Sequence, residues 1–235
     1  YDSTTGKKLG IDSGDPRDFK DIEDLKEAFR KQTEFFLSRF MEMYSRTLSW
    51  HTFSLPTITG STLAVGCLEK GKTLQEEGSN HHYTAVAITS MANVIDSIEA
   101  IDACVFQQKA ITMDELIDML DHNFEGNEEK RQMLLNRAPK FGNNIEEVDR
   151  YSYWLIDMLD TEVKKYRDPM GGPYTLVIAT QAYNVELGKL VGATADGRLA
   201  TTPLADNASP MAGMDVNGPT AVVNSLACCD PLVPE

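Results

Sequence analysis

Cysteine is scarce in this chain, and its few copies are poorly placed for cross-linking. Four cysteines occur among 235 residues, at Cys67, Cys104, Cys228 and Cys229. No pair is separated by two residues, and two adjacent thiols make a poor structural disulfide. The pattern therefore predicts a reduced, cytoplasmic protein without a zinc site or any other bound metal.

Positive charge is also in short supply. Lysine and arginine number 22 against 36 acidic residues, which gives a net charge of -14 and an isoelectric point near 4.7. An acidic surface repels phosphate backbones and anionic lipid, so neither nucleic acid nor a membrane is expected as a partner. Long hydrophobic runs and a signal peptide are missing too. Hydrophobic residues still make up 42% of the chain, which is enough for a buried core.

The apolar spacing predicts a mostly helical chain. Apolar residues recur three, four or seven positions apart, as on one face of a helix. Expected helices cover residues 22–50, 88–106, 112–123, 127–138, 145–166 and 219–230. Asp21 is placed to cap the first of them, and Thr112 with Glu115 forms a capping box for the third.

Two segments favour extended structure instead. Residues 55–66 are rich in β-branched and small residues, and residues 174–185 form an apolar run that barely alternates. The second segment is typical of a strand that is covered on both faces. Residues 188–218 are predicted to form a long loop. These strands are too few to close a sheet, which suggests part of a larger α/β structure.

Recognisable catalytic motifs are few. No phosphate-binding loop, GxSxG elbow or HExxH helix occurs. His81 and His82 are adjacent, which favours two surface histidines over metal ligands. The string at 66–69 places the thiol of Cys67 two residues before the carboxylate of Glu69. Such a pair suits radical or acid–base chemistry, and the alternative is a small buried hydrophobic residue at a strand end.

Seven short strings follow one another in a fixed order. They are NVIDS at 93–97, NFEG at 123–126, KFGNN at 140–144, YRDPMGG at 166–172, GATADGR at 192–198, PLAD at 203–206 and NGPTA at 217–221. Their order and spacing resemble those of the glycyl-radical enzymes, the pyruvate formate-lyase superfamily. The resemblance runs from about residue 6 to residue 226. It implies a ten-stranded α/β barrel, built from two antiparallel half-barrels and wrapped by helices, of which residues 1–235 form the middle-to-late part.

The resemblance also implies a reaction. In this family one loop carries a cysteine that becomes a thiyl radical, and another carries the glycine that stores the radical. The segment around Cys67 resembles a later Gly-Cys-x-Glu-Lys-Gly-Lys segment rather than the thiyl loop, so Cys67 and Glu69 are expected to be structural. Cys228 and Cys229 lie where the family has no catalytic thiol. No Arg-Val-x-Gly-Tyr string occurs, so both radical loops are missing and this chain alone is expected to be inactive.

Partners and cofactors follow from the same resemblance. We expect no cofactor bound by this chain, and a glycyl radical on the full-length protein that a radical-SAM activating enzyme installs. A homodimer and a small polar or carboxylate substrate are expected, with lyase, dehydratase or decarboxylase chemistry. Two alternatives stay open: formate acetyltransferase activity, and a homologue without a radical that acts as a binding or scaffold protein.

Two groups of site residues are expected from residue chemistry. If residues 174–185 form one strand of a barrel, alternation points the odd positions inward, and the cavity candidates are Val177, Ala179, Gln181 and Tyr183. The alternative for Gln181 is a hydrogen bond to neighbouring backbone. In the long loop, Asp196 and Arg198 are expected to hold the backbone, because a guanidinium fork can satisfy several loop carbonyls at once.

Overall fold

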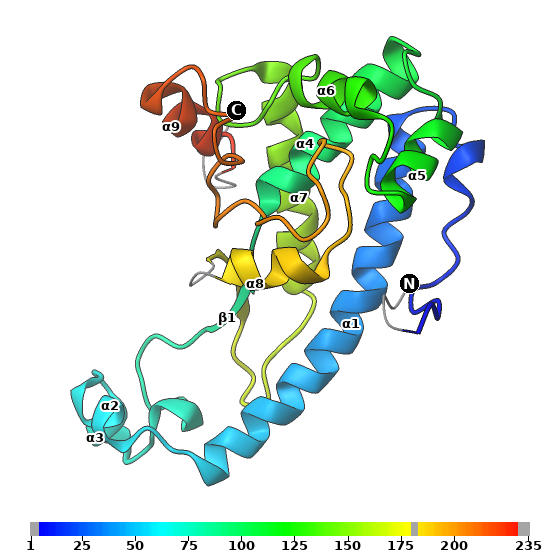
Figure 1. The fold of residues 1–235 in the computed structure, drawn as a ribbon. Helices are drawn as coiled ribbons and strands as arrows, with labels where there is room; N and C mark the ends of the chain where they lie inside the picture. Colours follow the sequence, from blue (N-terminus) through cyan, green and yellow to red (C-terminus); the bar gives the residue numbers. More distant parts are fainter. Residues whose placement is uncertain (1–4, 180–182, 230–235) are drawn as a thin grey trace. The chain divides into compact units, whose positions relative to one another are not determined.

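A computed structural model describes residues 5–179 and 183–229 of the chain. Within these residues the chain is mostly helical (Figure 1). The helices are α1 (Ile22–Ser54), α2 (Ile58–Leu63), α3 (Cys67–Lys70), α4 (Met91–Ile101), α5 (Met113–Asp121), α6 (Glu128–Asn136), α7 (Glu146–Val163), α8 (Tyr183–Leu190) and α9 (Pro219–Ala227), and the strands are β1 (Thr84–Ile88) and β2 (Tyr174–Ile178). Two short 3-10 turns, Pro16–Asp18 and Leu74–Glu76, and a π-helical turn, Asp102–Gln107, complete the elements.

The two strands pair in parallel. The amide of Thr84 donates to the carbonyl of Pro173, and the amide of Ala179 donates to the carbonyl of Ile88, each at 3.0 Å. From the first of these hydrogen bonds to the second, the residue numbers rise along both strands, so the two strands run parallel. Parallel strands need a crossover connection, and here the residues from α4 to α7 provide it. The α/β class is thus confirmed at its coarsest level.

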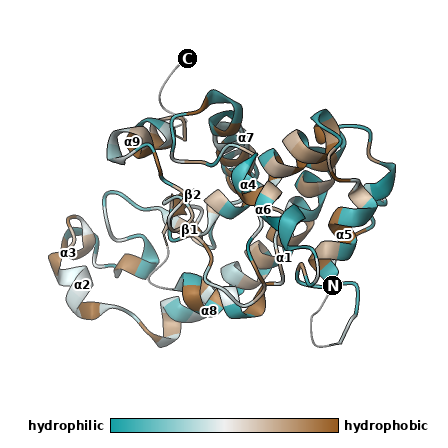
Figure 2. Cartoon of the chain, turned by 45° about the horizontal axis from the view of Figure 1, so that its top comes forward, coloured by the Kyte–Doolittle hydropathy of each residue, from teal (hydrophilic) through white to brown (hydrophobic). Residues whose placement is uncertain are grey.

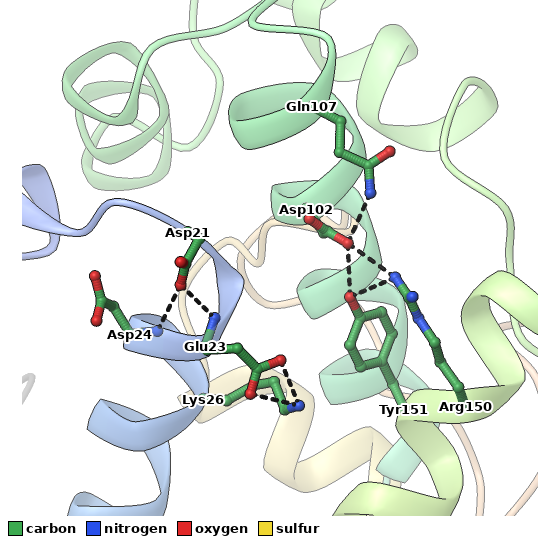
Figure 3. Close-up of polar contacts among 8 residues, drawn as sticks. All are labelled: Asp21, Glu23, Asp24, Lys26, Asp102, Gln107, Arg150 and Tyr151. Atoms are coloured by element: carbon green, nitrogen blue, oxygen red, sulfur yellow. Dashed lines mark hydrogen bonds and ion pairs between the residues drawn. The ribbon is translucent and has the colours of Figure 1, made fainter.

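Two predicted helix starts are confirmed. Asp21 Oδ1 accepts the amides of Glu23 at 3.0 Å and of Asp24 at 3.2 Å, so it satisfies two free donors at the start of α1 (Figure 3). At α5, Thr112 Oγ1 accepts the amide of Glu115 at 3.2 Å, and the Glu115 carboxylate accepts the amide of Thr112 at 2.8 Å. Helix α1 ends at Ser54, slightly beyond the expected end.

The extended structure predicted for residues 55–66 is wrong, because part of this segment forms α2. Contacts with the later turn Leu74–Glu76 stabilise the short helix. Gln75 Nε2 donates to Thr57 Oγ1 at 2.5 Å, and the amide of Leu74 donates to Ser61 Oγ at 2.9 Å. These partners lie 13 and 18 positions away in sequence, so local β propensity is overridden by tertiary hydrogen bonds.

The strand predicted over residues 174–185 is too long. Strand β2 ends at Ile178, and Tyr183 already begins α8. In α8 the carbonyl of Asn184 accepts the amide of Leu204, and Asn184 Nδ2 donates back to the carbonyl of Leu204, both at 3.2 Å. This reciprocal pair ties the helix to the long loop, which the apolar pattern of the segment did not indicate. Residues 191–218 contain no helix or strand, as expected of that loop.

The chain divides into two compact units. Unit 1 comprises Tyr1–Lys31, Ala87–Met158 and Ile178–Glu235, and unit 2 comprises Gln32–Val86 and Leu159–Val177. The core of unit 1 includes the buried side chains of Ala100, Cys104, Ile111, Leu116, Met119, Phe124, Leu134, Ala138 and Ala195. That of unit 2 includes Met41, Val86, Val163 and Tyr174. The hydroxyls of Ser45 and Tyr174 lie 2.9 Å apart, in hydrogen-bond contact.

Unit 2 also presents many large apolar side chains to solvent. We call this set the apolar surface of unit 2: Phe36, Phe40, Met43, Trp50, Phe53, Leu55, Ile58, Leu63, Val65 and Leu68. Figure 2 shows part of it as hydrophobic segments on α2. In the part of the chain that the structure describes, no helix combines the length and apolar character needed to cross a membrane.

Candidate functional site

A cavity of about 330 Å³ lies within unit 2. Its polar lining includes His51, Gln75, His81, His82 and Asp168. Asp168 belongs to the YRDPMGG motif, whereas the histidines come from α1 and from the segment before β1. The cavity therefore combines a motif residue with side chains that no motif contains.

Asp168 is held in this cavity by four hydrogen bonds. Its Oδ1 atom accepts the amides of Met170 and Gly172, each at 2.9 Å. Its Oδ2 atom accepts the hydroxyl of Thr84 at 2.9 Å and lies 2.7 Å from His82 Nε2. Burial alone would raise the pKa of Asp168, but the hydrogen bonds from His82, Thr84 and the two amides outweigh it and hold the pKa below its ordinary value. The carboxylate is therefore ionised at neutral pH.

Glu77 completes a cluster with this pair. Its Oε1 atom lies 3.7 Å from His82 Nε2, and one donor atom each from Glu77, His82 and Asp168 lies within 4.8 Å of the other two. The sequence predicted two surface histidines at this point. His81 is exposed as expected, whereas His82 is partly buried against a residue 86 positions away. No local spacing could have indicated that contact.

Cys67 and Glu69 lie at the short helix α3. Cys67 is 2% exposed, and the Glu69 carboxylate accepts the amide of Gly66 at 3.1 Å. The carboxylate thus satisfies a free donor at the helix start instead of facing the thiol as a base. These contacts favour the predicted structural role for both residues, which stays a prediction.

The structure does not place Tyr183 on the strand that contains Val177. Val177 is in β2 and Ala179 directly follows it, and both are partly buried. Tyr183 is in α8 and is 63% exposed, so strand alternation does not place it beside Val177. Gln181 lies outside the described residues. Whether Val177 and Ala179 line a substrate cavity stays a prediction.

Arg198 lies within the long loop and is 4% exposed. Its guanidinium donates to four loop carbonyls: Leu199 at 3.0 Å, Thr202 at 2.8 Å, Val191 at 3.4 Å, and Gly192. A loop has no ladder partners for such carbonyls, so a buried fork of donors replaces them. These contacts support the loop-structuring role expected for Arg198.

Asp196 joins this loop to the helix α4. Its Oδ1 atom accepts the amide of Arg198 at 3.1 Å and the hydroxyl of Thr194 at 2.5 Å. Its Oδ2 atom accepts Asn93 Nδ2 at 2.7 Å, and Asn93 Oδ1 accepts the amide of Ala205 at 2.8 Å. The strings NVIDS, GATADGR and PLAD are therefore partners in one hydrogen-bond network.

A second polar centre in unit 1 surrounds Asp102 (Figure 3). Asp102 Oδ2 accepts the hydroxyl of Tyr151 at 2.7 Å, Arg150 Nη2 at 2.9 Å and Gln107 Nε2 at 2.9 Å. Burial, the hydrogen bond to Asp102 and the negative charge of Asp102 raise the pKa of Tyr151. The phenol therefore stays protonated and acts as a donor. The sequence contained no motif for this centre, because its members come from the π-helical turn and from α7.

Comparison with known proteins identifies the family. A family model described as pyruvate formate lyase-like matches residues 1–188. Trans-4-hydroxy-L-proline dehydratase of Clostridioides difficile is 33% identical over 230 residues, which cover 98% of this chain and 29% of that protein. Isethionate sulfite-lyase of Bilophila wadsworthia is 38% identical over 225 residues, which cover 93% of this chain and 26% of that protein.

The fold similarity agrees with these sequence matches. The crystal structure of hydroxyproline dehydratase from C. difficile, with trans-4-hydroxy-L-proline bound, matches with a TM-score of 0.92 at 33% identity, over 98% of this chain and 29% of that one. The chain thus spans under a third of the length of the relatives it matches. The resemblance expected from the seven ordered strings is confirmed: the chain belongs to the pyruvate formate lyase-like family of glycyl-radical enzymes.

Proposed function

We propose that this chain is the middle-to-late part of the barrel of a glycyl-radical lyase. The full protein holds a small polar or carboxylate substrate inside a sealed barrel for thiyl-initiated hydrogen abstraction and bond cleavage. The observation that carries the proposal is the match of almost the whole chain to relatives named as a dehydratase and a sulfite-lyase. Dehydratase or other lyase chemistry is therefore favoured over formate acetyltransferase activity.

The surface of unit 2 supports the proposal that more of the barrel covers this chain. Phe53 is 83% exposed, Leu63 82% and Val65 73%. Large apolar side chains that are exposed in such number over one unit are typical of surfaces that another part of a protein covers. In the full protein, neighbouring barrel segments cover them, and the thiyl cysteine and the radical glycine belong to those other segments.

The chain's own residues position and enclose the reaction in this proposal. The network of Asn93, Asp196 and Arg198 holds the loop 191–218 in one conformation. Val177 and Ala179 lie near the substrate, at the carboxyl end of β2. Water must be excluded, because a carbon radical survives only where stray hydrogen donors are absent. The protein is a cytoplasmic homodimer that receives its radical from a radical-SAM activating enzyme.

Electron paramagnetic resonance of the full protein tests the proposal. After anoxic treatment with an activating enzyme and S-adenosylmethionine, we expect a glycyl doublet. The activated protein should then consume a small hydroxylated or sulfonated substrate of the type of trans-4-hydroxy-L-proline or isethionate. A protein that takes up no radical would overturn the proposal in favour of a binding or scaffold role. Formate release from pyruvate and coenzyme A would instead establish the acetyltransferase alternative.

Two controls place the radical residues. The 235-residue chain alone should show no doublet under the same treatment, because it contains no Arg-Val-x-Gly-Tyr string. In the activated full protein, Cys67→Ala should keep measurable turnover. A complete loss of turnover, with the glycyl doublet and the fold intact, would assign the thiyl role to Cys67.

A further inference from the structure

We propose that Glu77, His82 and Asp168 form a binding site for one divalent transition-metal ion in unit 2. The donor set is one imidazole nitrogen and two carboxylate oxygens. Zn²⁺, Mn²⁺ and Fe²⁺ accept such a mixed set, whereas Mg²⁺ and Ca²⁺ prefer oxygen ligands throughout. The site is independent of the proposed function, because that proposal assigns no role to any of these three residues.

The distances between the donor atoms fit one small ion. His82 Nε2 lies 2.7 Å from Asp168 Oδ2 and 3.7 Å from Glu77 Oε1. Two ligands of a tetrahedral Zn²⁺ with bonds of 2.0–2.1 Å lie about 3.3 Å apart. The two observed separations fall on either side of that value, and all three donor atoms lie within 4.8 Å of one another. Side-chain rotations that close the wider gaps would bring the three donors onto one ion. Three protein ligands leave a fourth position for water or another ligand.

Asp168 is held in place for such a role. Two backbone amides bind its Oδ1 atom, and the hydroxyl of Thr84 binds its Oδ2 atom. Hydrogen bonds of this kind orient metal ligands in known sites. The Asp168 side chain is only 3% exposed, whereas those of His82 and Glu77 are 22% and 31% exposed. A buried anchor with two more accessible ligands gives an ion a route of entry from solvent.

Gly172 leaves the space that the three donors share. A Cβ atom at this position would lie 2.5 Å from His82 Cδ2, 2.8 Å from Asp168 Oδ2 and 3.0 Å from Glu77 Oε1. All three side chains therefore converge on the one point that the absent side chain of Gly172 keeps open. A methyl group there must displace at least one of them.

Glu77 adopts a backbone conformation that side chains rarely occupy. Its φ angle is +60°, in the left-handed region that glycine enters without steric cost. Glutamate at such a position is uncommon, and here its carboxylate extends toward His82. A Glu77→Gly variant therefore removes a ligand without imposing any strain on the fold.

Metal titration of the purified full protein, stripped with a chelator, tests the site. Calorimetry with Zn²⁺ should give one ion per chain. Co²⁺ should give the intense visible absorption of a tetrahedral nitrogen- and oxygen-ligated ion. Both His82→Ala and Glu77→Gly should weaken Zn²⁺ binding at least about 100-fold, since loss of an outer-shell partner alone costs 10–100-fold. The matched control is His81→Ala, which removes the neighbouring imidazole and should bind as the wild type does.

Gly172→Ala tests the geometry without altering any ligand. We expect the same loss of Zn²⁺ binding and of Co²⁺ absorption, with Gly192→Ala as the control, because nothing lies within 4 Å of a Cβ atom at Gly192. Circular dichroism and the unfolding midpoint report whether Gly172→Ala still folds, and Glu77→Gly decides the question if it does not. Wild-type affinity in both Glu77→Gly and His82→Ala would overturn the proposal, as would equal loss in His81→Ala. Neither result bears on whether the protein takes up a glycyl radical.

Discussion

Arg198 satisfies the carbonyls of a loop that has no sheet or helix to do so. Lysine at this position keeps the charge, but its three donors share one nitrogen and cannot reproduce the planar guanidinium that meets four carbonyls. We predict that Arg198→Lys lowers the free energy of unfolding by about 2 kcal/mol or more, because hydrogen bonds to a charged donor contribute about 1.5–3 kcal/mol each. Urea unfolding measures the loss.

A matched control is available in Arg46. Its side chain is 78% exposed and pairs with Glu42 on the surface of α1. Arg46→Lys should change the free energy of unfolding by a few tenths of a kcal/mol at most, since exposed ion pairs contribute little. Equal effects of the two substitutions would show that the buried guanidinium of Arg198 does not stabilise the loop.

Asp96 is a buried carboxyl with an incomplete set of partners. Its Oδ1 atom accepts the amide of Phe141 at 2.8 Å, whereas Oδ2 has no hydrogen-bond partner among the described residues. Burial raises its pKa from 3.8 to about 7, against the opposing effects of Lys140 and the Phe141 amide. The folded protein therefore keeps a proton that the unfolded chain releases near pH 3.8.

The sign of the pH effect follows from this proton. Between about pH 4 and 7 the folded state binds more protons than the unfolded state, so this carboxyl lowers the free energy of unfolding as pH rises. Asp96→Asn has no carboxyl at this position and so does not lose stability in this way as pH rises. We predict that its free energy of unfolding, relative to that of wild type, increases by up to about 1.4 kcal/mol per pH unit over this range. Urea unfolding at several pH values measures it, with the exposed Glu129→Gln as control. A constant difference between Asp96→Asn and wild type would contradict the raised pKa.

The sequence predicted single residues well where one residue's chemistry dictates its partners. Arg198 in a long loop must find carbonyls, and Asp21 before a helix must find amides. It failed for His82, because the partner of that imidazole is Asp168, and only the completed fold brings the two together. Asp96 is similar, since its pKa depends on burial rather than on its neighbours in sequence.

At the scale of elements, the start of α5 offers the cleanest test. Thr112 was expected as a cap from its spacing to Glu115, and both hydrogen bonds of the capping box are present. We predict that Thr112→Ala lowers the free energy of unfolding by about 1 kcal/mol, because a free first-turn amide loses its acceptor. Thermal unfolding measures it.

Thr47 is the control for this substitution. It lies in the interior of α1, and its hydroxyl donates to the carbonyl of Met43 four residues earlier. Alanine is the stronger helix former there, so Thr47→Ala should be neutral or slightly stabilising. A loss at Thr47 equal to that at Thr112 would mean that the hydroxyls, not the cap position, matter.

Element boundaries were predictable where the helix period and a capping box agreed, as at the start of α5. They were not predictable where distant segments decide the conformation. Gln75 binds α2, and Leu204 binds α8, through hydrogen bonds that cross 18 and 20 residues. Both segments are β-rich in composition, so local propensity and the tertiary partners pointed in opposite directions.

At the scale of the whole molecule, the family was predictable from the sequence, whereas the division into two compact units was not. The seven strings indicated the family from their order and spacing, and in the structure most of them are hydrogen-bond partners of one another. Asn143 illustrates this: it donates to the carbonyl of Met214 and accepts the amide of Asn217, which belongs to the NGPTA string. The two-unit division depends on which helices share contacts, and the spacing of motifs contains no such information.

The apolar surface of unit 2 leads to the last prediction, which concerns the chain prepared alone. Each large apolar side chain contributes about 1.5–3 kcal/mol when it is fully removed from water. A chain that exposes Phe53, Leu63 and Val65 together should therefore self-associate as its concentration rises and should bind a hydrophobic dye. Light scattering and dye fluorescence measure both effects.

A triple variant tests whether this surface, and not another part of the chain, causes the association. Phe53→Ser, Leu63→Gln and Val65→Thr together should shift the chain toward the monomer and reduce dye binding severalfold. Val216→Thr is the control, because Val216 in unit 1 is 80% exposed but does not belong to that surface. If the wild-type chain stays monomeric and binds no dye, the surface needs no cover, and one support for assigning this chain to a larger barrel is lost. If association persists in the triple variant, another part of the chain drives it.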